Sequence, residues 1–356
     1  MPTGDMLRRR IALRVRQRQG VLASRVADAW AHAHPGWFEA LDAHARQMLL
    51  EDAENHLAQL AVAIAFDAPE EFGAYLRWAA GVLATRGVGR CNMDEVVDLI
   101  ESALAPDLTD EERRVLAPHF VSARRALAAP APSGPAAVED GWTLAQRVFL
   151  QALLGGHRQA ALAVVEGLLR EGRPIEDLYL RLVQDSLHQV GRLWETNAIS
   201  VADEHMATAL AQYVVGRLYT RLPPAVVSRG RMVLAGVAGE LHQVGANIVA
   251  DLLEADGWVM RFLGTNVPHS GIVASATAHE AAVVGISATM LVNLPRVADI
   301  VRDLKALPKP PVIVVGGAAF QAAPRAWRET GADLFAADAR LARQELRQLS
   351  AGGPVR

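Results

Sequence analysis

The chain divides into a long helical region and a region in which strands and helices alternate. Up to about residue 127, apolar residues recur at the spacing of one helix face, as in Leu49, Ala53, Leu57, Leu60 and Ile64. After Pro223-Pro224, short runs of Val, Ile and Ala predict five strands, over 232–237, 258–263, 282–287, 312–315 and 333–336. Near-continuous apolar strands that alternate with helices are typical of a parallel sheet covered on both faces.

A second helical block lies between these two regions. Its apolar spacing predicts four helices, over 142–155, 157–171, 174–195 and 200–221. Gly155, Gly156 and Gly172 stand where helix C-caps favour glycine, and Pro174 suits a first helical turn. Four such helices joined by short turns indicate a four-helix bundle.

A stretch of small residues and prolines over 128–136, without charges, indicates a linker over 128–140 between the first helical region and the bundle. We therefore expect a multidomain protein. An N-terminal all-α domain occupies 1–127, a four-helix bundle occupies 141–222, and a doubly wound, Rossmann-like α/β domain with a five-stranded parallel sheet occupies 230–352.

Composition narrows the class of protein. The 356 residues suffice for two or three domains, and 51% hydrophobic with 21% charged residues argues against disorder. A net charge of −3 gives no basic surface for nucleic acid, so we expect no direct DNA binding. Cys91 stands alone and excludes an internal disulfide, which fits a reducing compartment. No apolar run reaches the roughly 18 residues of a membrane span, and no secretory signal begins the chain. We expect a cytoplasmic protein without membrane contact.

Polar residues and glycines follow three of the expected strands. They are Glu240, His242 and Gly245 after the first, Ser287 and Thr289 after the third, and Gly316 and Gly317 after the fourth. Ligands of open parallel sheets bind beyond the carboxyl ends of the strands. An acid two residues before a histidine can bind one ring nitrogen, fix the tautomer and raise the basicity of the other nitrogen. Glycines let a bulky cofactor approach. The set suits a large ligand whose metal is held by one histidine.

In this order, Glu-x-His-x-x-Gly, Ser-x-Thr and Gly-Gly resemble the cobalamin-binding domain of methionine synthase and its relatives, in which Asp-x-His-x-x-Gly is commoner. The resemblance implies that His242 is the lower ligand of cobalt and that Glu240 orients it. It also implies a channel for the nucleotide tail of the cofactor. The residues that would line this channel are Ser287, Thr289, Gly316 and Gly317, with Gly245 beside the tail.

The helical bundle carries a second resemblance. Trp194, Glu204 and His205 form a Trp-x9-Glu-His pattern, and a capping box of Ser200 and Asp203 would open the last helix. The pattern is similar to the signature of the cap in CarH-type cobalamin photoreceptors. It implies that adenosylcobalamin is the cofactor, that Trp194 packs on the adenosyl group, and that Glu204 and His205 line the upper pocket. Light would break the cobalt–carbon bond and shift the cap. A downstream signalling protein or a homo-oligomer, such as a dimer, would receive the signal.

Two departures from the CarH type are visible. Glu195 stands where that type can place a histidine that binds cobalt after illumination, and the N-terminus has no helix-turn-helix module. With a Trp-rich N-terminal helical domain, the chain resembles the photocobilins. That resemblance implies a bilin such as biliverdin as a second chromophore. Cys91 is a candidate for its attachment, although a lone cysteine is more often inert.

Other functions use the same motifs. A corrinoid carrier protein that serves a methyltransferase needs the same lower histidine and sheet, although its cap usually presents smaller residues than Trp194. A scaffold with a vestigial domain is a third interpretation. A mutase is excluded because no stretch supplies a catalytic barrel of about 250 residues. We expect no enzymatic activity of the chain itself.

The candidate residues also have structural alternatives. These are a helix N-cap for His242, a core aromatic for Trp194, a cap of the next helix for Ser287 or Thr289, and a tight turn for Gly316-Gly317. The N-terminal histidines lack metal-ligand spacing, and the arginines over 8–18 suit a solvated helix face.

Overall fold

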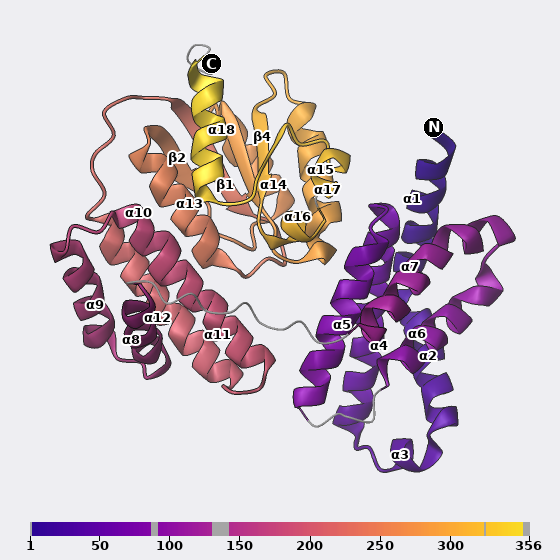
Figure 1. Cartoon of the computed structure of the whole chain (residues 1–356). Helices are drawn as coiled ribbons and strands as arrows, with labels where there is room; N and C mark the ends of the chain where they lie inside the picture. Colours follow the sequence, from indigo (N-terminus) through magenta and orange to yellow (C-terminus); the bar gives the residue numbers. More distant parts are fainter. Residues whose placement is uncertain (1, 87–91, 130–141, 324, 352–356) are drawn as a thin grey trace. The chain divides into compact units, whose positions relative to one another are not determined.

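The structure is a computed structural model that describes residues 2–86, 92–129, 142–323 and 325–351. The chain separates into two compact units, Met1–Ser133 and Gly134–Arg356, and each is described by itself (Figure 1). The expected linker over 128–140 lies outside the described residues except for its first two positions. Cys91, the candidate for bilin attachment, also lies outside them.

The first unit is all-helical in its described residues. Its helices are α1 (Pro2–Gln17), α2 (Gln19–Ala33), α3 (Pro35–Glu39), α4 (Ala43–Ala65), α5 (Pro69–Thr85), α6 (Met93–Leu104), the short 3-10 helix η1 (Ala105–Asp107) and α7 (Asp110–Ala128). Helix α4 packs against α1, α2 and α5. Leu57, Leu60 and Ile64 on α4 are fully buried, so the helical spacing of the sequence marks the core of this unit.

Arg8 and Arg14 of α1, and Arg18 directly after it, pair with carboxylates of the same unit. Arg8 lies 3.3 Å from Asp67, and Arg18 lies 2.7 Å from Asp107. Arg14 lies 2.8 Å from Glu112, whose side chain is buried. These ion pairs join α1 to the turn after α4 and to α7, and join Arg18 to η1. The expectation of a simply solvated arginine face is therefore wrong for these three residues, because they brace the helical unit.

The second unit begins with a helical bundle, which we call the cap. It contains α8 (Thr143–Leu154), α9 (Arg158–Arg170), α10 (Ile175–Asp177), the π-helical segment η2 (Leu178–Gln184), α11 (Asp185–Glu195) and α12 (Val201–Tyr219). The predicted capping box at the start of α12 is confirmed, since Ser200 and Asp203 bind each other's backbone N–H groups. The helix predicted over 174–195 is present, but its middle, Leu178–Gln184, is π-helical. Tyr179 lies in these turns and contacts the sheet domain, as described below.

The sheet has the strand order β2-β1-β3-β4-β5, and all its pairs are parallel. The strands are β1 (Gly230–Gly236), β2 (Trp258–Phe262), β3 (Val283–Ser287), β4 (Val312–Gly316) and β5 (Leu334–Ala336). The connecting helices are α13 (Gln243–Ala255), α14 (His269–Ala278), η3 (Leu291–Asn293), α15 (Leu294–Lys305), α16 (Ala318–Ala322), α17 (Ala326–Glu329) and α18 (Ala339–Ala351). The predicted Rossmann-like α/β fold is confirmed (Figure 1).

The register of the sheet aligns the strand ends. Gly236 pairs with Ser287, Ser287 with Gly316, and Gly316 with Ala336. The carboxyl ends of β1, β3, β4 and β5 therefore form one straight edge. The loops that carry the candidate residues all leave from this edge.

The cap and the sheet domain share one hydrophobic core. Val244, Ile248 and Leu252 of α13 belong to the same buried cluster as the cap residues. The hydroxyl of Tyr179 donates a 3.0 Å hydrogen bond to Asp251 on α13, and Arg340 on α18 lies 2.6 Å from Asp177. These contacts hold the cap against α18 and against α13, the helix that follows His242. No helix in the described parts of the chain is both long and apolar enough to cross a bilayer.

Candidate cofactor site

A tight turn after β1 places Glu240 at the base of the site. Gly239 has a φ of +84°, in the region that favours glycine, and its N–H donates to Asn266 at 2.8 Å. The turn directs the side chain of Glu240 into the protein, where it is fully buried. A carboxylate at such a position needs hydrogen-bond donors to remain charged.

Donors from two loops surround the Glu240 carboxylate. Oε1 accepts Nδ1–H of His242 at 2.5 Å and the His242 backbone N–H at 3.1 Å. Oε2 accepts the Thr289 backbone N–H at 2.5 Å and the Asn293 side-chain amide at 3.3 Å. Burial alone would raise the pKa of Glu240, but the hydrogen bonds from His242 and Thr289 outweigh it and lower the pKa to about 2. Glu240 is therefore ionised at neutral pH.

The ionised Glu240 fixes the chemical state of His242. A carboxylate can only accept, so Nδ1 of His242 carries the proton and Nε2 keeps its lone pair in the neutral ring. The His242 side chain is 58% exposed, and the ring nitrogen opposite Glu240 is the one available to a metal. The hydrogen bond to Glu240 raises the pKa of His242, and burial only partly opposes this. His242 occupies the N-cap position of α13, but its side chain makes no capping bond.

Asn293 is a site residue that the sequence motifs did not reveal. It is buried, and its amide joins Glu240 to Arg296, whose guanidinium donates to Asn293 Oδ1 at 2.9 Å. In the sequence, Asn293 resembles an ordinary N-cap, because it directly precedes α15, whose first turn contains Pro295. This pattern does not indicate a site residue. The Asn293 side chain makes no cap, because it is held by Glu240.

The Ser-x-Thr loop acts on the site through its backbone. Neither Ser287 nor Thr289 takes an N-cap position, since Met290 and Asn293 occupy those of η3 and α15. The backbone N–H of Thr289 donates a hydrogen bond to Glu240. This loop therefore ties the third strand to the histidine loop. Its expected contact with a nucleotide tail stays a prediction.

The three candidate glycine positions differ in their surroundings. A Cβ at Gly245 would meet no atom within 4 Å, so the first turn of α13 borders open space. A Cβ at Gly317 would lie 2.3 Å from the carbonyl oxygen of Ala288, and one at Gly316 would lie 2.9 Å from that of Ala336. Gly317 also has a φ of +101°. Close packing of neighbouring loops accounts for Gly316 and Gly317, whereas Gly245 leaves room for a ligand.

The cap residues lie at the turn between α11 and α12. Trp194 is half-buried in the last turn of α11 and is not part of the buried cluster of the cap. Glu204 and His205 open α12, and His205 Nδ1 lies 2.5 Å from Glu204 while its side chain is 75% exposed. The charge of Glu204 also contributes to the raised pKa of His242. The structure thus brings Glu204 of the cap close to the histidine of the sheet domain.

The surroundings of His242 fit a large apolar ring with a metal at its centre. Leu241, beside His242, is 76% exposed, and Met290, beside Thr289, is also exposed. Val201 on the first turn of α12 is an exposed apolar residue on the cap side. A cobalamin held by His242 would cover apolar surface of this kind, and the open space beside Gly245 could receive its tail. The residues present therefore fit the cofactor that the motifs imply.

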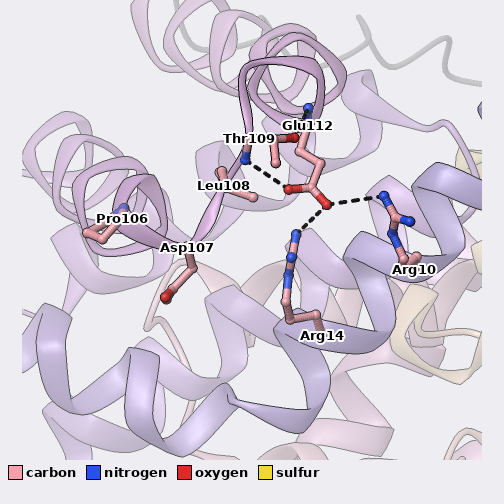
Figure 2. Close-up of a pocket in the computed structure, with 7 residues that line it drawn as sticks. All are labelled: Arg10, Arg14, Pro106, Asp107, Leu108, Thr109 and Glu112. Carbon is pink, nitrogen blue, oxygen red and sulfur yellow. Dashed lines mark hydrogen bonds and ion pairs between the residues drawn. The ribbon is translucent and has the colours of Figure 1, made fainter.

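The first unit contains a hollow of about 460 Å³, lined by Arg10, Arg14, Pro106, Asp107, Leu108, Thr109 and Glu112. Figure 2 shows Arg10 and Arg14 directed at one oxygen of Glu112, while the Thr109 N–H binds the other at 2.9 Å. The Glu112 carboxylate thus pairs with both guanidinium groups, and the other acid of the hollow, Asp107, pairs with Arg18 and Arg25. We therefore assign this hollow a structural role.

Comparisons with known proteins agree with the geometry. Residues 230–347 match a family described as a B12 binding domain, and residues 145–219 match a second family with the same description. Dimethylamine corrinoid protein 1 of Methanosarcina acetivorans is 29% identical over 217 residues, covering 58% of this chain and 100% of that protein. The protein of the same name in Methanosarcina mazei is 28% identical over 207 residues, covering 57% of this chain and 94% of its own length.

A solved structure resembles the second unit. The monomethylamine corrinoid protein of Methanosarcina barkeri aligns with a TM-score of 0.51 at 20% identity, covering 58% of this chain and 100% of that chain. A likeness at this identity concerns the fold alone. The family matches extend from residue 145 to residue 347, so the first unit lies outside them.

Proposed function

We propose that this cobalamin-binding protein is a corrinoid carrier, which presents a methyl group on cobalt to a partner methyltransferase. The observation that carries the proposal is the hydrogen bond from the exposed His242 to the buried Glu240 at the edge of the sheet, within a B12 binding domain. The relatives named dimethylamine corrinoid protein, which align over 94–100% of their own length, favour a carrier over a light sensor. On this proposal the chain has no enzymatic activity of its own.

On this proposal, the residues at the site have separate roles. Glu240 keeps the proton on Nδ1 of His242, so that Nε2 is the donor atom for the metal. Cobalamin, when bound, supplies a cobalt centre that can hold and release a methyl group. His205 and Val201 are exposed at the start of α12, so a partner enzyme can reach the cap side of the site.

A second candidate function is a light sensor that binds adenosylcobalamin. The arrangement of Trp194 at the end of α11, with Glu204 and His205 at the start of α12, favours it. A half-buried indole suits the cover of an adenosyl group better than the smaller side chains usual in carriers. The dimer and the bilin of this candidate stay predictions, and Cys91 lies outside the described residues.

One experiment separates the two functions. The full chain is mixed in the dark with methylcobalamin or adenosylcobalamin, and affinity, absorption and hydrogen exchange of the cap are measured before and after green light. A carrier binds methylcobalamin at least as tightly as adenosylcobalamin, and light leaves the exchange of α11 and α12 unchanged. A strong preference for adenosylcobalamin with light-dependent exchange in these helices would replace the carrier with the sensor. No binding of either compound would overturn both.

A further inference from the structure

The start of helix α15 departs from two rules that stabilise a helix. Its N-cap residue, Asn293, makes no side-chain bond to the backbone N–H groups that follow, although asparagine is among the best N-caps. Arg296 in the first turn places a cation at the positive end of the helix dipole, and this turn contains no acid. Such departures from local rules are expected where residues serve a site rather than their own helix.

Both side chains instead form a chain of hydrogen bonds that ends at Glu240. Arg296 Nη1 donates to Asn293 Oδ1 at 2.9 Å, and Asn293 Nδ2 donates to Glu240 Oε2 at 3.3 Å. Asn293 is 1% exposed, whereas Arg296 is exposed. The bonds therefore connect the surface of α15 with the buried carboxylate that holds His242.

Arg296 and Asn293 also lie beside the turn that precedes Glu240. A Cβ at Gly239 would be 3.4 Å from Asn293 Oδ1 and 3.8 Å from Arg296 Nη1. On the other side, the Gly239 N–H donates to Asn266 from the loop after β2. The turn that directs Glu240 into the protein is thus held between two loops.

A second arginine of α15 has different contacts. Arg302 lies 2.7 Å from Asp299 and 3.3 Å from Asp303, so its charge is paired on its own helix. Among the described residues, Arg296 has no carboxylate partner of this kind, and its hydrogen bond goes to the Asn293 amide. The orientation of Arg296 towards the site is therefore not a general property of the arginines of this helix.

The guanidinium of Arg296 determines which end of the Asn293 amide faces Glu240. The oxygen and the NH₂ group of an amide have nearly the same shape, so either could face the carboxylate. With the oxygen there, two acceptors would meet and Glu240 Oε2 would lose a donor. A guanidinium only donates, so Arg296 binds the amide oxygen and keeps the NH₂ group on Oε2. The position of Oε2 fixes that of Oε1, which accepts from His242 at 2.5 Å.

We propose that Arg296 is a positioning residue for His242. Through the Asn293 amide, it holds the Glu240 carboxylate in the orientation that directs Nε2 of His242 towards a metal. The inference rests on the cobalamin binding that also underlies the proposed function. It adds to the site an exposed residue that acts through two others and belongs to none of the motifs.

The test is a double-mutant cycle on the full chain, with methylcobalamin as the probe and absorption at one fixed pH. Arg296→Met removes the donors and should weaken binding about fivefold and lower the histidine-ligated fraction. Asn293→Ala should weaken binding about tenfold, because Glu240 loses a donor. In the Asn293→Ala background, Arg296→Met should change the affinity by less than about twofold, because no amide remains for Arg296 to hold.

The protein without cofactor gives an independent readout. The side-chain NH₂ signal of Asn293, identified in an amide NMR spectrum by its loss in Asn293→Ala, should exchange with water faster in Arg296→Met than in wild type. The backbone amides of α15 should stay as protected as in wild type, because the variant removes a cation from the helix N-terminus. Arg302→Met is the matched control on the same helix and should change neither the affinity nor the Asn293 signal.

Three results would overturn the inference. The first is an affinity of Arg296→Met within about twofold of Arg302→Met, and the second is unchanged exchange of the Asn293 NH₂ group. The third is a fivefold loss that persists in the Asn293→Ala background, since Arg296 would then act without the amide. Cobalamin binding by wild type would stand in all three cases. If wild type does not bind methylcobalamin, the proposed function falls and the inference falls with it.

Discussion

The carboxylate of Glu240 accepts a hydrogen bond from the imidazole of His242, which stands two positions later in the chain. The Glu240 side chain is fully buried and accepts the Nδ1–H of His242 at 2.5 Å, while the imidazole stays 58% exposed. The buried partner thus fixes the orientation and the tautomer of the exposed one. Residues that hold a metal-binding histidine in this way commonly change metal affinity by one or two orders of magnitude.

Replacement of Glu240 by Gln should therefore weaken cobalamin binding about 10- to 100-fold. A neutral amide can present its NH₂ group to His242 as well as its oxygen, so the proton is no longer fixed on Nδ1. Absorption titrations of the full chain with methylcobalamin measure both the affinity and the histidine-ligated fraction. Glu240→Asp, the residue commoner in the family that the motif resembles, is the control and should retain affinity within about tenfold. An unchanged spectrum and affinity in Glu240→Gln would contradict the orienting role.

The position of Trp194 leads to a prediction about the upper ligand. Trp194 is half-buried at the end of α11 and lies outside the buried cluster of the cap. Trp194→Ala should lower the free energy of unfolding by only about 1 kcal/mol, because the indole is half-buried and lies outside the buried cluster of the cap. Cobalamin should still bind, and any preference of wild type between the adenosyl and methyl forms should disappear. Equal selectivity in variant and wild type would show that the indole does not cover the upper ligand.

The strands and the histidine motif could be predicted because each follows from a local pattern. Val, Ile and Ala runs mark β1 to β5, and the spacing of Glu240 and His242 is itself a motif. The π-helical turns of η2 could not be predicted, since Leu178, Tyr179, Leu182 and Val183 also fit an ordinary helix. Tyr179 in these turns donates a hydrogen bond to Asp251, and this contact between residues 72 positions apart is not visible in a local pattern.

The same limit applies to the other residues that the sequence did not reveal. Asn293 precedes α15 as a cap residue would, and only the fold brings it to Glu240. Arg296 follows it in the same helix, and only the contact between Asn293 and Glu240 makes Arg296 part of the site. The spacing of apolar residues in a helix does not show which distant segment the helix will contact. Periodicity therefore does not predict contacts between segments that are far apart in the sequence.

The buried histidine of the first unit should make that unit sensitive to acid. Burial lowers the pKa of His56 to about 4, and His56 Nδ1 lies 2.9 Å from the Tyr75 hydroxyl. In the unfolded chain His56 binds a proton below about pH 6.5, whereas in the folded unit it does so only below about pH 4. The free energy of unfolding should therefore fall as the pH falls from about 6.5 to 4, by up to about 3 kcal/mol from this group.

His56→Gln tests this, because the amide can still bind the Tyr75 hydroxyl but does not titrate. Urea unfolding of the full chain, with hydrogen exchange in α4 to report on the first unit, should show a shallower pH dependence in the variant. A remaining slope is expected from His119, whose pKa burial also lowers. His44→Gln is the control, since His44 is exposed. If His56→Gln and wild type keep the same slope, another group causes the acid sensitivity.

Asp251 should give the second unit the opposite pH dependence. It lies on α13, 3.0 Å from the Tyr179 hydroxyl and 3.2 Å from the Asn247 amide, and burial with the nearby charge of Glu254 raises its pKa to about 6. In the unfolded chain the carboxyl releases its proton near pH 3.8. The folded state therefore holds a proton between about pH 4 and 6 that the unfolded state has lost. The free energy of unfolding should fall as the pH rises through this range, by about 3 kcal/mol.

Asp251→Asn removes the titration and keeps an oxygen that can accept from Tyr179. The variant should match wild type at pH 4 and exceed it at pH 7 by about 3 kcal/mol, as measured by hydrogen exchange of the α13 amides in the full chain. Glu254→Gln, which removes only the neighbouring charge, should recover part of this gain. Because α13 begins at His242 and packs against the cap, a more stable α13 should also slow the opening of the cap at neutral pH. An Asp251→Asn variant less stable than wild type at pH 7 would mean that the ionised carboxylate is accommodated at this interface, and that its bond to Tyr179 outweighs the cost of burying the charge.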